Sequence, residues 1–138
     1  MGSFLSSLLG AGATNEAAPS ASEGSGILSF HSSARWQLHF NSAKDSSQLT
    51  VIDFAAAWCG PCKFMEPAVH GMASKFSDVV FAKIDVDELP DVAQEFQVQA
   101  MPTFVLVKNG KEVDRVVGAK KDELEKKIEK HRAFQASS

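Results

Sequence analysis

Hydrophobic and polar positions follow two different periods along residues 27–138. Short apolar runs rich in β-branched and aromatic residues predict strands at 27–30, 49–55, 79–85, 103–107 and 113–117. Between these runs, apolar residues three to four positions apart predict helices that begin near residues 33, 59, 90 and 120. The run at 49–55 is nearly all apolar, which is typical of a central strand buried on both faces.

The predicted order of elements is β-α-β-α-β-α-β-β-α. Its alternating part requires parallel strands joined by crossover helices. Asn109-Gly110, between the last two strands, is a strong hairpin signal and adds an antiparallel edge. We therefore expect an α/β domain with a central five-stranded mixed sheet flanked by four helices. Pro67 falls inside the second helix and should kink it.

Residues 1–26 follow neither period. Sixteen of these 26 residues are Gly, Ala or Ser, and the charged side chains among them are Glu16 and Glu23. Such a segment cannot bury enough apolar surface to offset the entropy lost on ordering. The sequence therefore predicts a flexible N-terminal extension at 1–26 and one folded domain at 27–138.

The chain begins Met-Gly-Ser-Phe-Leu-Ser, which fits the N-myristoylation pattern with Gly2 as the acceptor. One myristoyl chain gives only reversible membrane binding, and no Cys or Lys/Arg cluster nearby supplies a second signal. The alternatives are a plain flexible tail and a mitochondrial presequence, although presequences are Arg-rich and the first Arg here is Arg35. We expect a cytoplasmic protein with at most weak, reversible membrane association.

Composition and charge narrow the functional classes. Fourteen Lys and Arg against 17 Asp and Glu give a net charge of −3, so no global positive field attracts nucleic acid. No apolar run approaches the ~20 residues of a membrane-spanning helix. Two Cys residues can neither build a small secreted disulfide scaffold nor complete a four-ligand zinc site. Nothing in the sequence requires an oligomer, and we expect a monomer.

The strongest chemical signal is the Trp-Cys-Gly-Pro-Cys motif at 58–62, where a buried strand passes into a helix. Unpaired backbone N–H groups and the positive end of the helix dipole should stabilise the Cys59 thiolate and lower the pKa of this thiol. Cys62 lies one turn further along and faces the same sulfur. The pair predicts attack of Cys59 on a substrate disulfide, followed by resolution of the mixed disulfide by Cys62.

The alternatives for this motif are a structural metal half-site and an accidental pair. A metal would need two further ligands, and His70 should lie about 12 Å from Cys62 along the helix axis. Cys-x-x-Cys at a strand-to-helix junction in this order of elements is instead typical of a redox pair. We expect no metal and no bound cofactor, so that the chemistry rests on a redox-active Cys59–Cys62 disulfide.

Asp53 interrupts the apolar strand six residues before Cys59. Burial should raise the pKa of this carboxyl group. Asp53 could then accept the proton of Cys62, through water, when Cys62 must become a nucleophile. The alternative is a strand-end carboxylate that reaches solvent or pairs with a cation such as Lys83 on the neighbouring strand.

Three further positions allow a functional and a plain structural interpretation. Met101-Pro102 directly precedes a strand; a cis bond there would expose the Met101 backbone to an extended substrate segment, whereas a trans bond would make an ordinary turn. Gly118 could let a partner backbone approach closely or could be a plain turn residue. Trp58 could form an exposed apolar lip over the disulfide or could belong to the core.

Together these motifs resemble the thioredoxin family, and most closely its plant h type with an N-terminal extension. The resemblance spans roughly residues 30–133. It rests on motifs that fall in family order: Val51-Ile52-Asp53-Phe54 with Trp58-Cys59-Gly60-Pro61-Cys62-Lys63, then Lys83-Ile84-Asp85-Val86-Asp87, then Met101-Pro102-Thr103-Phe104, then Gly118. It implies the thioredoxin fold and the activity of a protein disulfide reductase.

The resemblance also implies individual roles and partners. Cys59 would be the nucleophile, Cys62 the resolving thiol, Asp53 the buried acid, Pro102 the cis-proline and Pro67 the helix kink. Electrons would come from an NADPH-dependent thioredoxin reductase and pass to disulfide-containing target proteins. The positions expected to contact targets are Trp58, Gly60, Pro61, Met101, Pro102 and Gly118, with Lys83 and Pro67 in supporting positions.

Two other functions stay open at this point. One is a binding module in which the redox pair is incidental, and a double Cys→Ser variant would separate it from a reductase. The other is a disulfide oxidase or isomerase, which its reduction potential would reveal. The Gly-Pro between the cysteines resembles reducing thioredoxins more than it resembles isomerases or glutaredoxins.

Overall fold

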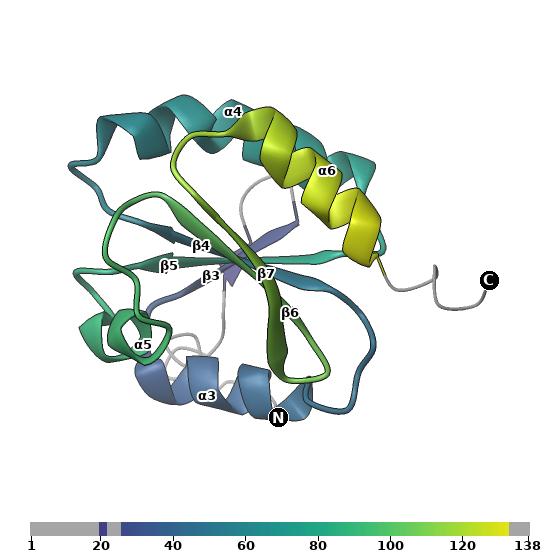
Figure 1. Cartoon of the computed structure of the whole chain (residues 1–138). Coiled ribbons are helices and arrows are strands. Elements are labelled where there is room, and N and C mark those ends of the chain that lie inside the picture. The colour runs from purple at the N-terminus through teal and green to yellow at the C-terminus, as the bar shows by residue number, and fades with distance from the viewer. Residues whose placement is uncertain (1–19, 22–25, 133–138) are drawn as a thin grey trace, which may run out of the picture.

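The computed structural model describes residues 20–21 and 26–132, which fold around one mixed sheet with strand order β2-β3-β5-β4-β6-β7 (Figure 1). The strands are β2 (Ser20–Ala21), β3 (Ile27–Phe30), β4 (Thr50–Ala55), β5 (Val80–Asp85), β6 (Thr103–Lys108) and β7 (Lys111–Val117). The helices are α3 (Ser33–Ser42), α4 (Gly60–Lys75), α5 (Pro90–Glu95) and α6 (Lys121–His131). The five predicted strands and four predicted helices are all present.

The sheet combines both strand directions, as the sequence predicts. β3, β5 and β4 are parallel, whereas β6 runs antiparallel to β4 and β7 antiparallel to β6. Helices α4 and α6 cover one face of the sheet, and α3 and α5 cover the other (Figure 1). In the central strand β4, Asp53 lies beside Lys83 of β5 and Phe104 of β6.

The two-residue strand β2 was not predicted. Ser20 pairs with Ser29 and Ala21 with Leu28, so β2 extends the open edge of β3. Ser and Ala carry little β-propensity, and backbone pairing at an open edge leaves no signature in the side-chain pattern. The rest of the predicted extension, including Gly2, lies outside the described residues.

The helix boundaries follow local chemistry closely. Ser32 caps α3, because its hydroxyl oxygen accepts a hydrogen bond from the Arg35 N–H at 3.2 Å. Helix α4 begins one residue later than expected, with Cys59 as its N-cap, and it continues through Pro67, so the kink stays a prediction.

Each face of the sheet has its own buried core. On the α4/α6 face, side chains such as Val51, Met65, Leu106, Leu124 and Ile128 are almost fully buried. On the α3/α5 face, aromatic rings contact one another in a chain of pairs. These rings belong to Phe30, Trp36, His39, Phe40, Phe54 and Phe96. None of the helices in the described part of the chain is both long and apolar enough to cross a membrane.

Candidate active site

The two cysteines lie where β4 ends and α4 begins. They form a disulfide with Cα atoms 5.3 Å apart, within the usual range. Cys59 is the N-cap of α4, and the Cys62 backbone N–H donates a hydrogen bond to the Cys59 sulfur at 3.1 Å. In the reduced protein, this N–H and the helix dipole stabilise a Cys59 thiolate. Pro61 fits the first turn of the helix, where its missing N–H leaves no carbonyl unpaired.

The segment around Pro102 contributes to the surroundings of the disulfide. Met101 packs against the buried cluster that contains both cysteines. The Met101–Pro102 bond is cis, as the resemblance implies, and the Pro102 carbonyl accepts a hydrogen bond from the Gly118 N–H at 2.8 Å. Gly118 has φ +102°, a conformation that favours glycine. The distant Gly118 is thus joined to the Met101-Pro102 segment, whose Met101 packs against the cluster of Cys59 and Cys62.

Trp58 is an exposed side chain and not part of the core. It is 68% exposed, and its indole Nε1 donates a hydrogen bond to Asp87 Oδ2 at 2.9 Å, which fixes the ring at the surface. Phe64, two residues after Cys62, is 73% exposed. Neither Asp87 nor Phe64 was predicted to take part in the site. The buried stripe of α4, which includes Met65, leaves Phe64 outside it, and this pattern was a usable signal.

Asp53 lies behind the disulfide on the α4/α6 face. Burial raises the pKa of its carboxyl group to about 7; the Lys83 ammonium opposes this shift and the Glu66 carboxylate adds to it. Asp53 and Cys62 both line a pocket of about 180 Å³, which is why the Asp53 side chain is only half-buried by surface area. A pocket of this size and polarity has room for water between the carboxyl group and the Cys62 thiol.

The cation proposed as an alternative partner of Asp53 has a second carboxylate beside it. Lys83 neighbours Asp53 across the β4–β5 pair, yet its Nζ lies 3.4 Å from Glu66 Oε2 on α4. The ammonium group is therefore shared between two acids. Glu66 was missed by the sequence analysis, although its position four residues after Cys62 on one helix places both on the same side.

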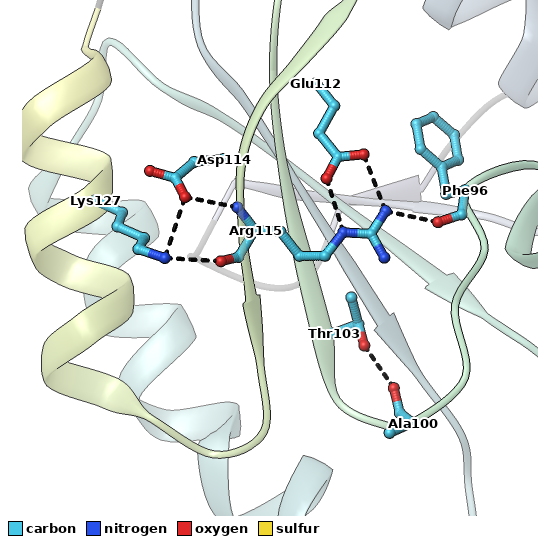
Figure 2. A network of polar contacts seen from close by, with 7 residues as sticks. All are labelled: Phe96, Ala100, Thr103, Glu112, Asp114, Arg115 and Lys127. Carbon is cyan, nitrogen blue, oxygen red and sulfur yellow. Dashed lines mark hydrogen bonds and ion pairs between the residues drawn. The ribbon is translucent and has the colours of Figure 1, made fainter.

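A polar network holds the loop that leads to Pro102 (Figure 2). The Arg115 guanidinium donates to the Phe96 carbonyl oxygen at 2.6 Å and to both Glu112 carboxylate oxygens at 2.7 and 2.9 Å. Nearer to Pro102, the Thr103 hydroxyl donates to the Ala100 carbonyl oxygen at 2.5 Å. These bonds fix both ends of the segment that carries Met101.

The cysteines have no set of further metal ligands in the described part of the chain. There, no group of three or more His, Cys, Asp and Glu side chains is arranged to hold a metal ion. His70 is an exposed residue of α4. The chemistry that the described residues support is that of the sulfur pair itself.

A disulfide at the strand-to-helix junction of this sheet, beside a cis-proline, defines a dithiol–disulfide oxidoreductase. The family model for thioredoxin matches residues 31–130. The chain belongs to the thioredoxin family.

Plant h-type thioredoxins are similar to this chain over most of its length. It is 64% identical over 133 residues to Thioredoxin H2 of Arabidopsis thaliana, a match that covers 96% of this chain and 100% of that protein. It is 53% identical over 131 residues to Thioredoxin H2-2 of Oryza sativa subsp. japonica, covering 93% of each. The crystal structure of thioredoxin NaTrxh from Nicotiana alata is 71% identical, with a TM-score of 0.79, covering 82% of this chain and 98% of that one. The thioredoxin fold and the h-type resemblance are confirmed.

Proposed function

We propose that this thioredoxin is a cytoplasmic monomer that reduces disulfides of target proteins and is itself reduced by an NADPH-dependent thioredoxin reductase. Thiol–disulfide exchange is the activity of the family. What we propose is the electron donor, the target proteins and the compartment. One observation supports it most: the Cys62 N–H lies 3.1 Å from the Cys59 sulfur at the start of α4. Because this environment favours the thiolate, Cys59 is a reactive nucleophile towards target disulfides at neutral pH.

The proposed reaction has two exchange steps. The Cys59 thiolate attacks one sulfur of the target disulfide, forms a mixed disulfide and releases one target thiolate. Asp53 then accepts the Cys62 proton through water, and the Cys62 thiolate attacks the Cys59 sulfur and releases the second target thiolate. Two electrons have passed to the target, which gains one proton from solvent and one from Asp53. The chain retains the Cys59–Cys62 disulfide.

Target binding is proposed to use the surface around the disulfide. Trp58, Gly60 and Pro61 next to the cysteines are exposed, and Met101 packs against the cysteine cluster, so we infer that targets contact these residues and Gly118. An extended target segment can pair with backbone groups there without a fixed sequence, because main-chain hydrogen bonds supply the affinity.

Insulin reduction tests the proposal directly. We expect rapid NADPH oxidation with thioredoxin reductase and the wild-type chain, and loss of turnover in both Cys59→Ser and Cys62→Ser. Cys62→Ser should also accumulate the mixed disulfide, since Ser cannot resolve it. A folded wild-type chain without turnover would contradict the proposed donor. Activity that survives the double Cys→Ser change would favour a binding module.

The reduction potential separates a reductase from an oxidase or isomerase. We expect a value near that of thioredoxins, about −270 mV, and not near about −180 mV, the value for protein disulfide isomerase. Equilibration with glutathione buffers of known ratio measures it. A potential near the isomerase value would overturn the assignment as a reductase.

We also propose that the protein associates reversibly with membranes through a myristoyl group on Gly2. Intact-mass measurement of the chain from a eukaryotic cell, together with cell fractionation, tests it. Loss of the initiator Met without the added mass of a myristoyl group would contradict acylation. Removal of an N-terminal segment together with mitochondrial fractionation would contradict the cytoplasmic location.

A further inference from the structure

Charged groups of both signs surround the buried carboxyl group of Asp53. Helix α4 contributes Lys63 and Glu66 to the pocket behind the disulfide, and strand β5 contributes Lys83 and Asp85. On the other flank, β6 places the uncharged Phe104 beside Asp53. The charge state of Asp53 therefore depends on how these four neighbours balance.

The strand register gives Lys83 the strongest position for stabilising an Asp53 anion. The two residues are direct neighbours across the parallel β4–β5 pair, and both side chains lie on the α4/α6 face. A cation held against a carboxylate favours its ionised form, and such a carboxylate is a weak proton acceptor. An unopposed Lys83 would thus make Asp53 a poor base for Cys62.

Glu66 opposes this effect from the facing helix. Its Oε2 lies 3.4 Å from Lys83 Nζ, and Glu66 lines the same pocket as Asp53 and Cys62. The ion pair is partly exposed, with 36% of the Lys83 and 50% of the Glu66 side chain accessible, so it contributes little to the stability of the fold. Its position beside a proton acceptor gives it a different consequence.

We propose that Glu66 is a positioning residue for the proton transfer from Cys62: by pairing with Lys83, it draws the ammonium group away from Asp53 and keeps Asp53 basic enough to accept the proton. The step is the one described above, in which the proton moves from Cys62 Sγ to the Asp53 carboxylate and the Cys62 thiolate displaces the target from Cys59. The inference rests on the proposed role of Asp53.

The titration of Asp53 tests the electrostatic part. In the full chain labelled with ¹³C-aspartate, the NMR midpoint of Asp53 should fall by about one pH unit in Glu66→Gln. In a Lys83→Gln background, the same Glu66→Gln change should shift the midpoint much less, since the cation is gone. Glu129→Gln, an equal charge change on an exposed position of α6 outside the pocket, should shift nothing. An unchanged midpoint, or equal shifts in both backgrounds, would overturn the inference.

Single-turnover kinetics test the catalytic part. The reduced chain is mixed with insulin, quenched with acid, and the decay of the mixed disulfide is measured by mass spectrometry. In Glu66→Gln, the acid limb of the plot of decay rate against pH should shift to lower pH together with the Asp53 midpoint. The plateau rate should fall a few-fold. High salt should shrink the difference. A profile identical to that of the wild type would contradict the inference.

Asp53→Asn separates failure of this inference from failure of the proposed mechanism. If Asp53 accepts the proton, Asp53→Asn should slow mixed-disulfide decay by about 100-fold and leave the first attack by Cys59 unchanged. If mixed-disulfide decay is slow in Asp53→Asn but the Asp53 midpoint does not shift in Glu66→Gln, only the role of Glu66 is overturned. A fast Asp53→Asn overturns the proton-acceptor role itself, and with it this inference.

Discussion

The two faces of the sheet bury ionisable side chains in different ways. On the α4/α6 face, Asp53 and its charged neighbours open onto a pocket beside Cys62. On the α3/α5 face, His39 is packed against the rings of Phe30 and Trp36, with centroids 5.0 and 5.8 Å away. Its Nε2 is buried and has no hydrogen-bond partner in the described part of the chain.

This difference shows how one small sheet separates chemistry from stability. A group that must exchange a proton needs water and nearby charges, and the α4/α6 face supplies both at the end next to the disulfide. On the α3/α5 face, the pocket lined by His39, Phe40 and Thr50 of β4 holds only about 10 Å³, and the aromatic contacts there add packing energy without entering the reaction. Substitutions on the two faces should therefore have separable effects.

The largest effect should come from Trp36→Ala on the aromatic face. Trp36 is completely buried and contacts four other rings, so truncation should lower the free energy of unfolding by about 3–5 kcal/mol. Urea denaturation measures the loss. Insulin reduction per folded molecule should stay at the wild-type level.

Trp58→Ala is the matched control for this prediction, because the exposed ring of Trp58 lies beside the disulfide. It should change stability by less than about 0.5 kcal/mol while weakening target binding. A strong loss of activity per folded molecule in Trp36→Ala would contradict the separation of the two faces.

Asp53→Asn should have the next largest effect on stability, and this effect should grow as pH rises. The folded pKa is about 7 and the usual value 3.8, so the folded state holds the proton more tightly and loses stability as pH rises from about 4 to 7. Asn cannot ionise, so the free energy of unfolding of Asp53→Asn should exceed that of the wild type by at most about 4 kcal/mol at pH 8. Near pH 4 the two should be equal. Urea midpoints across pH 4–8 measure this, and parallel curves would contradict a buried carboxyl.

A smaller effect is expected at strand β7, where the adjacent residues Asp114 and Arg115 make contacts on opposite sides of the strand (Figure 2). Arg115 of β7 donates a hydrogen bond to the Phe96 carbonyl oxygen at the start of the loop before Pro102, whereas Asp114 pairs with Lys127 of α6, 3.1 Å away. Arg115→Gln should raise the KM for insulin a few-fold at nearly constant kcat, because a looser loop presents Met101 less well. Steady-state kinetics measure both constants.

Asp114→Asn provides the counterpart on the other side of the strand. It should leave KM unchanged and lower the free energy of unfolding by about 1 kcal/mol, as expected for a partly exposed network. An equal rise of KM in both variants would show that the loop is not held specifically by Arg115.

The fold was largely predictable because it rests on local signals. The apolar run at 49–55, the Ser32 cap and the Asn109-Gly110 hairpin each specify an element without reference to distant residues. The rules for crossover connections limit the possible strand orders, but the observed order, with β3 beside β5 and not β4, was not predicted. Strand β2 was not predictable, because its pairing depends on a free sheet edge and not on its own side chains.

The site was predictable only where sequence spacing carries chemistry. The spacing of Cys59 and Cys62 and the buried position of Asp53 are visible in the chain. The hydrogen bond from Trp58 to Asp87 and the ion pair of Glu66 with Lys83 span 29 and 17 residues, so they exist only after the strands have aligned. The same limit applies to the bond from Arg115 to Phe96.

The smallest expected effect belongs to His39 and has the opposite sign to that of Asp53. Burial lowers the pKa of His39 from its usual value of 6.5, so the folded state resists protonation. Stability should therefore decline as pH falls below about 6.5 towards the folded pKa, by roughly 1 kcal/mol or less because the ring is only partly buried. His39→Gln should flatten this decline, and His70→Gln, at an exposed position of α4, should not. Urea midpoints between pH 5 and 7.5, measured in the Asp53→Asn background to remove the opposing slope, would detect it. A decline that persists in His39→Gln would assign it to another group and leave the aromatic face without a titrating residue.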